Sequence, residues 1–68
     1  MKKYSAIIQD IYEREKQKHI TVEAIDSYLA HKIALKHTNA LREEIAIIRD
    51  TNNSIVFTYK DGFISANE

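Results

Sequence analysis

The sequence predicts one small α+β domain in which two or three helices precede a C-terminal β-hairpin. Three observations predict this class. Apolar residues between positions 3 and 50 recur at helical spacing. Residues 55–59 are β-branched or aromatic, and the Asp61-Gly62 pair that follows is typical of a hairpin turn. A chain of 68 residues has room for a single domain, residues 1–68, and for nothing more.

The first helix is predicted over residues 3–18. Its apolar side chains follow the stripe of a helix that is buried on one face. On the outer face, acidic and basic residues lie three or four positions apart, as in a self-neutralising helix surface. The members of the apolar stripe are Tyr4, Ile7, Ile8, Ile11 and Tyr12.

The second helix is predicted to begin at Thr21, a good N-cap residue, with the acidic Glu23 in its first turn. Residues 31–38 allow two interpretations. The helix continues through them, or it ends there and a third helix begins at a new N-cap, Thr38 or Asn39. We favour the break.

The third helix is predicted to end near Asp50, because the four residues after it have turn composition. Its buried face carries Leu41, Ile45 and Ile48 at helical spacing. If the second and third helices formed one rod, no helix-turn-helix would exist.

The hairpin is predicted from a two-residue turn at Asp61-Gly62. Counting outward from this turn pairs Lys60 with Phe63 and Tyr59 with Ile64. One hairpin face then packs on the helices and the other faces water. The face predicted to meet water carries Val56, Thr58, Lys60, Phe63 and Ser65.

Composition narrows the function classes. The ten basic and ten acidic residues balance, so the charge excess typical of nucleic-acid-binding proteins is missing. The absence of cysteine fits a reducing compartment, and we expect a cytoplasmic protein. The longest apolar run, residues 45–48, is too short for a membrane span. Domains of this size often gain core by pairing, so a homodimer is expected.

No catalytic or metal-binding pattern is found in the sequence. A phosphate cradle needs several glycines, and Gly62 is the only one. His19, His31 and His37 lack the spacing of ligands on one helix turn. We therefore expect no enzyme activity, no metal, no cofactor and no small-molecule substrate.

A basic face on the predicted third helix is the strongest functional signal. Lys36, Asn39, Arg42 and Arg49 fall opposite its apolar stripe, and its basic residues have no acidic neighbour three or four positions away. Arginine pairs with guanine, asparagine with adenine and lysine with phosphates. From the charge pattern alone, an ordinary solvated helix face is favoured over a DNA contact.

The element order resembles the winged-helix fold, a helix-turn-helix whose terminal hairpin forms the wing. The last third of the chain also resembles the effector domain of bacterial response regulators. Residues 41–45, Leu-Arg-Glu-Glu-Ile, and the Gly62-Phe63 pair at the hairpin occupy the matching places. The leading sheet and the first wing glycine of that family are missing. The resemblance implies that helix three reads the major groove and that Lys60 and Phe63 touch the DNA backbone or minor groove.

Two functions follow as expectations. The first is a small dimeric DNA-binding regulator of winged-helix type that uses Lys36, Asn39, Arg42, Arg49 and Lys60. The alternative is a protein–protein interaction module, such as a small inhibitor or adaptor that binds a larger protein. Phe63 with Val56 beside it is its predicted contact surface, because an exposed aromatic residue is a good interface anchor. A purely homo-oligomeric accessory protein is a third possibility.

Overall fold

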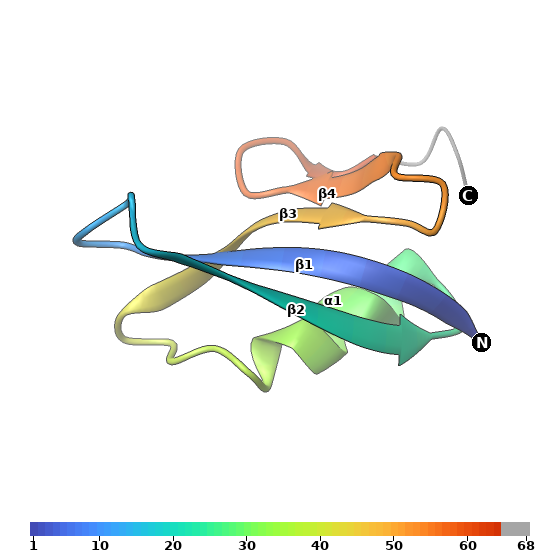
Figure 1. The fold of residues 1–68 in the computed structure, drawn as a ribbon, viewed down its shortest axis with the longest axis horizontal. Coiled ribbons are helices and arrows are strands. Elements are labelled where there is room, and N and C mark those ends of the chain that lie inside the picture. Colours follow the sequence, from blue (N-terminus) through green and yellow to red (C-terminus); the bar gives the residue numbers. More distant parts are fainter. Residues whose placement is uncertain (65–68) are drawn as a thin grey trace.

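The domain is a five-stranded antiparallel sheet with one short helix, in the strand order β2-β1-β3-β4-β5 (Figure 1). The computed structural model describes residues 1–64. The elements, in chain order, are β1 (Lys2–Asp10), β2 (Gln17–Ala24), α1 (Ser27–Leu35), β3 (Glu43–Arg49), β4 (Ile55–Thr58) and β5 (Gly62–Phe63). Within these residues, no helix is long and apolar enough to cross a bilayer.

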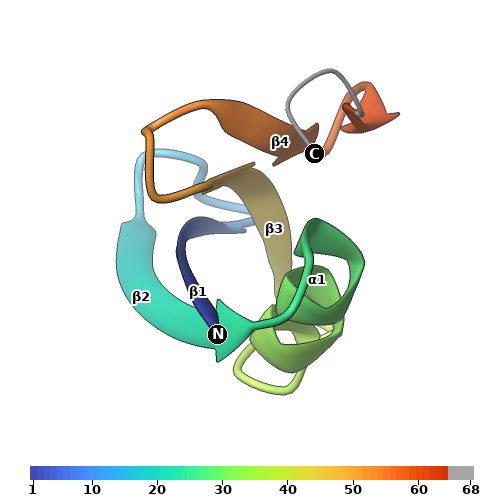
Figure 2. The same ribbon diagram turned by 90° about the vertical axis from the view of Figure 1, so that its right-hand side faces the viewer.

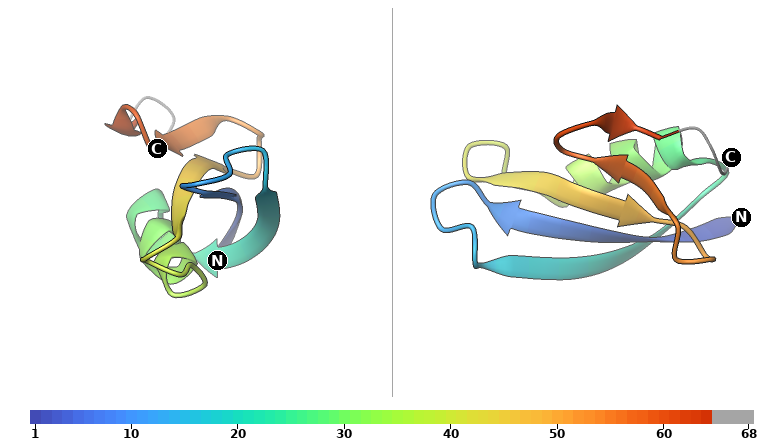
Figure 3. Two further views of the ribbon diagram at one scale, coloured as in Figure 1. Left: turned by 90° about the vertical axis from the view of Figure 1, so that its left-hand side faces the viewer. Right: turned by 90° about the horizontal axis from the view of Figure 1, so that it is seen from above.

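The helix covers one face of a strongly twisted sheet (Figure 2). β1 lies between β2 and β3 and is antiparallel to both, so β2 and β3 run parallel to each other. α1 connects these two parallel strands and lies against one face of the sheet, where it contacts β2, β3, β1 and β4 (Figure 3). Apolar side chains between α1 and the sheet form the core.

Alternation along the strands builds this core. Tyr4, Ala6 and Ile8 of β1 are each at most 1% exposed, and the residues between them face the other side of the sheet. The same period of two places Val22 and Ala24 of β2 in the core. The helix contributes the small side chains Ala30 and Ala34, both fully buried. Small residues allow the helix backbone to lie close to the sheet.

The predicted helices over residues 3–18 and from Thr21 onward are wrong, because these segments are the strands β1 and β2. In β1, the half-buried Ile7 on the open face completes an apparent helical stripe with Tyr4, Ile8 and Ile11. Apolar residues on both faces of a strand therefore imitate one face of a helix. In β2, the alternation of Ile20, Val22 and Ala24 is the stronger pattern.

The predicted third helix is also wrong, and a β-bulge explains why. β3 pairs with β1 in two registers, with Ile8 opposite Ile45 and Ile7 opposite Ile47, so Ala46 is the extra residue. The bulge changes the spacing of the buried residues Ile45 and Ile48 from two to three. A spacing of three is typical of a helix, which is why a strand was read as helical.

The single helix begins later than predicted. Asp26, and not Thr21, is the N-cap, and its carboxylate accepts from the backbone N–H of Leu29 at 2.9 Å. The helix ends at Leu35, with Lys36 as its C-cap. Within residues 1–64, two or three helices with a terminal hairpin are therefore not present, and the winged-helix resemblance is wrong because the sheet occupies most of the predicted helical segments.

The C-terminal hairpin exists, but with another turn and register. Phe57 lies opposite Phe63 and Thr58 opposite Gly62, so residues 59–61 form the loop. Gly62, the residue directly after the loop, has a φ of 73°, a left-handed conformation that glycine adopts without steric cost. The predicted opposition of Lys60 and Phe63 is wrong, and Phe63 moves to the face of Phe57. The prediction for Ser65 lies outside the described residues.

Candidate protein-interaction surface

Four aromatic rings from α1, β4 and β5 meet at the end of the sheet opposite β2. We call this group the aromatic cluster; its members are Tyr28, His31, Phe57 and Phe63. Centroid distances are 4.4 Å for His31–Phe57, 5.1 Å for Phe57–Phe63, 5.2 Å for His31–Phe63 and 5.7 Å for Tyr28–Phe63. All four pairs are tilted or edge-to-face, the arrangements that aromatic rings prefer.

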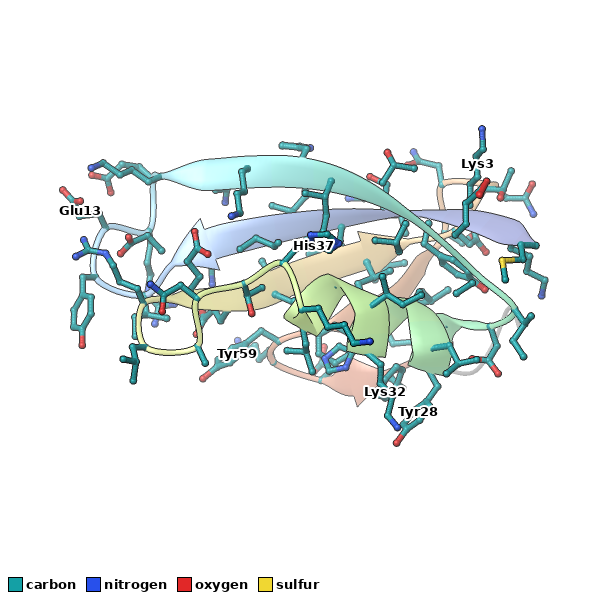
Figure 4. The ribbon with its side chains drawn as sticks, turned by 90° about the horizontal axis from the view of Figure 1, so that it is seen from below. Lys3, Glu13, Tyr28, Lys32, His37 and Tyr59 are labelled. Atoms are coloured by element: carbon teal, nitrogen blue, oxygen red, sulfur yellow. The ribbon has the colours of Figure 1, made fainter. Side chains whose placement is uncertain are left out.

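The outer part of the aromatic cluster is open to solvent. Tyr28 is 55% exposed and Phe63 is 44% exposed. The Nζ of Lys32 lies 5.2 Å from the centroid of the Tyr28 ring, within cation–π range. Figure 4 shows Tyr28 and Lys32 together on one side of the molecule, with Tyr59 along the same side. The exposed rings therefore form a patch with a cation at its border.

A shallow groove of about 450 Å³ continues this patch. His31 and Phe57 belong to both, so the cluster and the groove form one surface. Most of the groove lining is apolar, and Leu35 at the end of α1 is 48% exposed. The groove is lined by His31, Leu35, Thr38, Ala40, Glu43, Glu44, Ile45, Phe57 and Tyr59.

His31 is the titratable member of the aromatic cluster. Desolvation by the surrounding rings lowers the pKa of its imidazole below the usual 6.5. The ring is therefore neutral at pH 7 and packs against Phe57 as an aromatic side chain. The electrostatic character of the cluster surface at neutral pH comes from Lys32, which makes no ion pair with another residue of the described chain.

A second groove, of about 570 Å³, lies over the bulge of β3 and the β4–β5 loop. Arg14 and Lys60 are its basic residues, and Tyr59 borders both grooves. Both basic side chains of this groove come from loops, the β1–β2 loop and the β4–β5 loop. Its remaining lining residues are Gln9, Ala46, Ile47, Thr58 and Asp61.

The residues predicted to contact DNA do not share one face. Lys36 caps α1, and Asn39 lies in the turn that follows, where its side chain accepts from the N–H of Leu41. Arg42 and Arg49 stand at opposite ends of β3, more than about 20 Å apart along a strand of this length. Lys60 is in the β4–β5 loop. The sheet thus separates residues that a single helix was expected to bring together.

Arg42 also has partners that the sequence did not indicate. Its Nε donates to Asp10 Oδ2 at 3.0 Å, and its Nη2 lies 3.7 Å from Glu13 Oε2. Its guanidinium lies 5.6 Å from the centre of the Tyr12 ring. Arg49 donates to the backbone carbonyl of Asn53 at 3.4 Å. Arg42 has no acidic residue three or four positions away in the sequence, as stated above. In the fold, however, it has two acidic neighbours from the β1–β2 region, Asp10 and Glu13.

The two predicted protein-contact residues have different positions. Phe63 is exposed, as expected, and belongs to the aromatic cluster. Val56 is fully buried, so its predicted place on the water-facing side is wrong. It lies at a register shift between β3 and β4, which turns its side chain into the core.

Comparison with protein-family models, with curated proteins and with solved structures finds no match to this chain. The candidate surface therefore depends on geometry alone. Sequence reasoning missed Tyr28, His31 and Phe57 as members of an exposed surface. Tyr28 and Lys32 have the helical spacing of four residues that was available as a signal. No local pattern indicates that Phe57 and Phe63 lie opposite each other.

Proposed function

We propose that this domain is a protein-interaction module that binds a larger protein through the aromatic cluster and the adjoining groove. The observation that carries the proposal is the exposure of Tyr28 and Phe63, whose rings contact each other, with Phe63 also in contact with His31. Tyrosine and other aromatic side chains are enriched among the residues that dominate interface energies. Polar residues around the groove supply the rim that such interfaces have.

The chemistry of the surface indicates the kind of partner. An apolar side chain of the partner fits the groove beside Leu35 and Phe57. Lys32 and Lys36 follow each other by one helix turn next to the cluster, and neither forms an ion pair within residues 1–64. We therefore expect a segment that places a large apolar residue in the groove and an acidic residue over Lys32 and Lys36, away from Glu43 and Glu44 of the groove lining.

The test begins with affinity capture and ends with a purified pair. The wild-type chain is expected to retain a stoichiometric partner whose binding buries α1, β4 and β5, measured as slowed amide exchange in these elements. Phe63→Ser and Tyr28→Ser should each weaken binding at least tenfold by calorimetry, as expected for truncation of an interface anchor.

Tyr12→Ser is the matched control. Tyr12 is an aromatic residue that is 72% exposed and lies outside the cluster, in the β1–β2 loop. It should leave the affinity unchanged. Equal loss of binding in Tyr12→Ser and Phe63→Ser would contradict the assignment of the surface, as would exchange protection confined to other elements.

DNA binding stays a prediction, without the winged-helix geometry that motivated it. Titration of a labelled DNA duplex with the protein, at low and at moderate salt, tests this prediction. A cytoplasmic location is part of our proposal, because a chain without cysteine fits a reducing compartment.

A further inference from the structure

β2 is a long strand at one edge of the sheet. It runs from Gln17 to Ala24 and pairs only with β1, whereas the opposite edge strand, β5, has two residues. The β1–β2 register is uninterrupted from Lys2–Ala24 to Gln9–Gln17, so β2 carries no bulge. The views in Figures 2 and 3 show no element outside β2.

The hydrogen bonds around β1 determine which backbone groups of β2 are free. The N–H of Asp10 donates to the carbonyl of Lys16 at 3.0 Å, in continuation of the β1–β2 register. Hydrogen-bonded and non-bonded pairs alternate along an antiparallel ladder. The pairs of β1 with Lys18, Ile20 and Val22 are therefore the bonded ones. The backbone groups of Gln17, His19, Thr21 and Glu23 point away from β1.

Two bonds on the other side of β1 confirm this assignment. The N–H of Ile11 donates to the carbonyl of Arg42 at 2.8 Å, and the carbonyl of Lys3 accepts from Thr51 Oγ1 at 3.0 Å. Odd-numbered residues of β1 thus direct their backbone groups toward the β3 side. Their partners in β2 are odd-numbered as well and direct theirs to the free edge. Within residues 1–64, no backbone group bonds to this edge.

The side chains leave this edge open to pairing. Proteins usually protect a free edge with charged side chains, above all lysine, with proline, with a bulge or with a covering element. β2 has neither proline nor bulge, and Lys18 lies 3.4 Å from Glu43 across the sheet, which neutralises its charge. Ile20 is half-buried, so part of its apolar side chain remains uncovered beside the edge.

We propose that β2 pairs antiparallel with β2 of a second copy, around a twofold axis at Thr21, and joins two sheets into one. In this register Thr21 lies opposite Thr21 of the second copy, and His19 of each copy lies opposite Glu23 of the other. All of these residues belong to the set whose backbone groups are free, so they form the bonded pairs. Each His19–Glu23 pair sets an imidazole opposite a carboxylate, and these side chains can interact favourably. The strand is therefore complementary to a second copy of itself.

The apolar contacts agree with this register. Ile20 of one protomer lies opposite Val22 of the other, on the α1 side of the joined sheet. A twofold axis perpendicular to the sheet places both α1 helices on the same side. The aromatic clusters then lie at the two far ends and stay open. The pairing does not depend on the proposed function, and either can fail without the other.

The test uses the absence of cysteine in the chain. At an antiparallel bonded pair the two Cα atoms are about 5.5 Å apart, which suits a disulfide. Thr21→Cys is expected to form a covalent dimer under mild oxidation at concentrations where Asn52→Cys, in an exposed turn, stays monomeric. Sedimentation of the wild-type chain should show a concentration-dependent dimer.

Two further variants test the edge itself. Thr21→Pro removes the two central N–H donors at the axis without breaking a bond to β1 and should weaken the dimer at least tenfold. Thr21→Lys opposes two like charges at the axis, and Asn52→Lys is its matched control. A wild-type chain that is monomeric up to millimolar concentration would overturn the proposal. So would a dimer that both Thr21 variants leave intact, or equal crosslinking from Thr21→Cys and Asn52→Cys.

Discussion

The Nε of Arg42 donates to Oδ2 of Asp10 across 3.0 Å and connects the turn before β3 to the end of β1. Asp10 also accepts from the backbone N–H groups of Tyr12 and Glu13 at 2.8 and 2.9 Å. One carboxylate thus organises the β1–β2 loop and fixes the start of the neighbouring strand. The residue predicted to read guanine is part of the structural framework of the fold.

Arg42→Ala is expected to lower the melting temperature by a few degrees, because it removes the charge-assisted bond to Asp10 and the contact with Tyr12. Thermal unfolding followed by circular dichroism measures the change. Arg14→Ala is the control, since Arg14 lies in the neighbouring β1–β2 loop and has no ion pair within residues 1–64. An equal effect of both substitutions would show that the pair contributes nothing specific.

Acid should expose the role of the same carboxylate. The hydrogen bond from Arg42, followed by those from the backbone N–H groups of Glu13 and Tyr12, lowers the pKa of Asp10 from 3.8 to about 2. A carboxyl with a depressed folded-state pKa stabilises the fold above its unfolded pKa. This contribution is lost as the pH falls from 3.8 through about 2.

Denaturant unfolding at several pH values from about 5 to 2, the range in which carboxyls titrate, checks this expectation. The free energy of unfolding should fall less steeply in Asp10→Asn than in the wild type. Glu15→Gln, in the exposed β1–β2 loop, should retain the wild-type slope. An unchanged slope in Asp10→Asn would contradict the prediction.

His31 gives a dependence of the same sign at higher pH. Because burial lowers its folded-state pKa below 6.5, the unfolded chain binds the proton more tightly. The contribution of neutral His31 to the free energy of unfolding is therefore fully present above pH 6.5. It is lost as the pH falls through 6.5 toward the folded-state pKa. His31→Phe should remove this dependence and keep the ring contacts to Phe57. His37→Phe, at an exposed position after α1 and outside the aromatic cluster, is the matched control over about pH 7 to 5, the histidine titration range.

The bulge in β3 places Ile48 in the centre of the core, where it is fully buried. Ile48→Ala should cost about 2–5 kcal/mol and Ile48→Val about 0.5–1.5 kcal/mol of the free energy of unfolding. A domain of this size has only about 3–5 kcal/mol in total, so Ile48→Ala is expected to unfold much of the population. Denaturant titration measures both. A loss below 1 kcal/mol for Ile48→Ala, about what a surface position gives, would contradict the core assignment.

Particular residues explain why the sequence predicted some elements and not others. The sequence predicts a strand over residues 55–59, of which Ile55–Thr58 form β4, because β-branched and aromatic residues have no competing helical spacing there. Ile45 and Ile48 were read as helical because a bulge, which no local signal indicates, separates them by three. The aromatic cluster depends on pairing across strands. Phe63 was identified as exposed, but its neighbours follow from a register that the sequence leaves open.

That register depends on Gly62. Its φ of 73° lies in the left-handed region, which costs other residues about 1–2 kcal/mol, although a Cβ there would meet nothing within 4 Å. Gly62→Ala should therefore lower the free energy of unfolding by about 1 kcal/mol through the backbone alone. Gly62→Asn should cost less, because asparagine tolerates this conformation.

Gly62 also sets Phe63 opposite Phe57. The variant Gly62→Pro cannot adopt this φ, so it should weaken partner binding as well as stability. Comparing unfolding with partner affinity across the three variants checks both expectations, and equal stability of all three would show that the loop does not control the register.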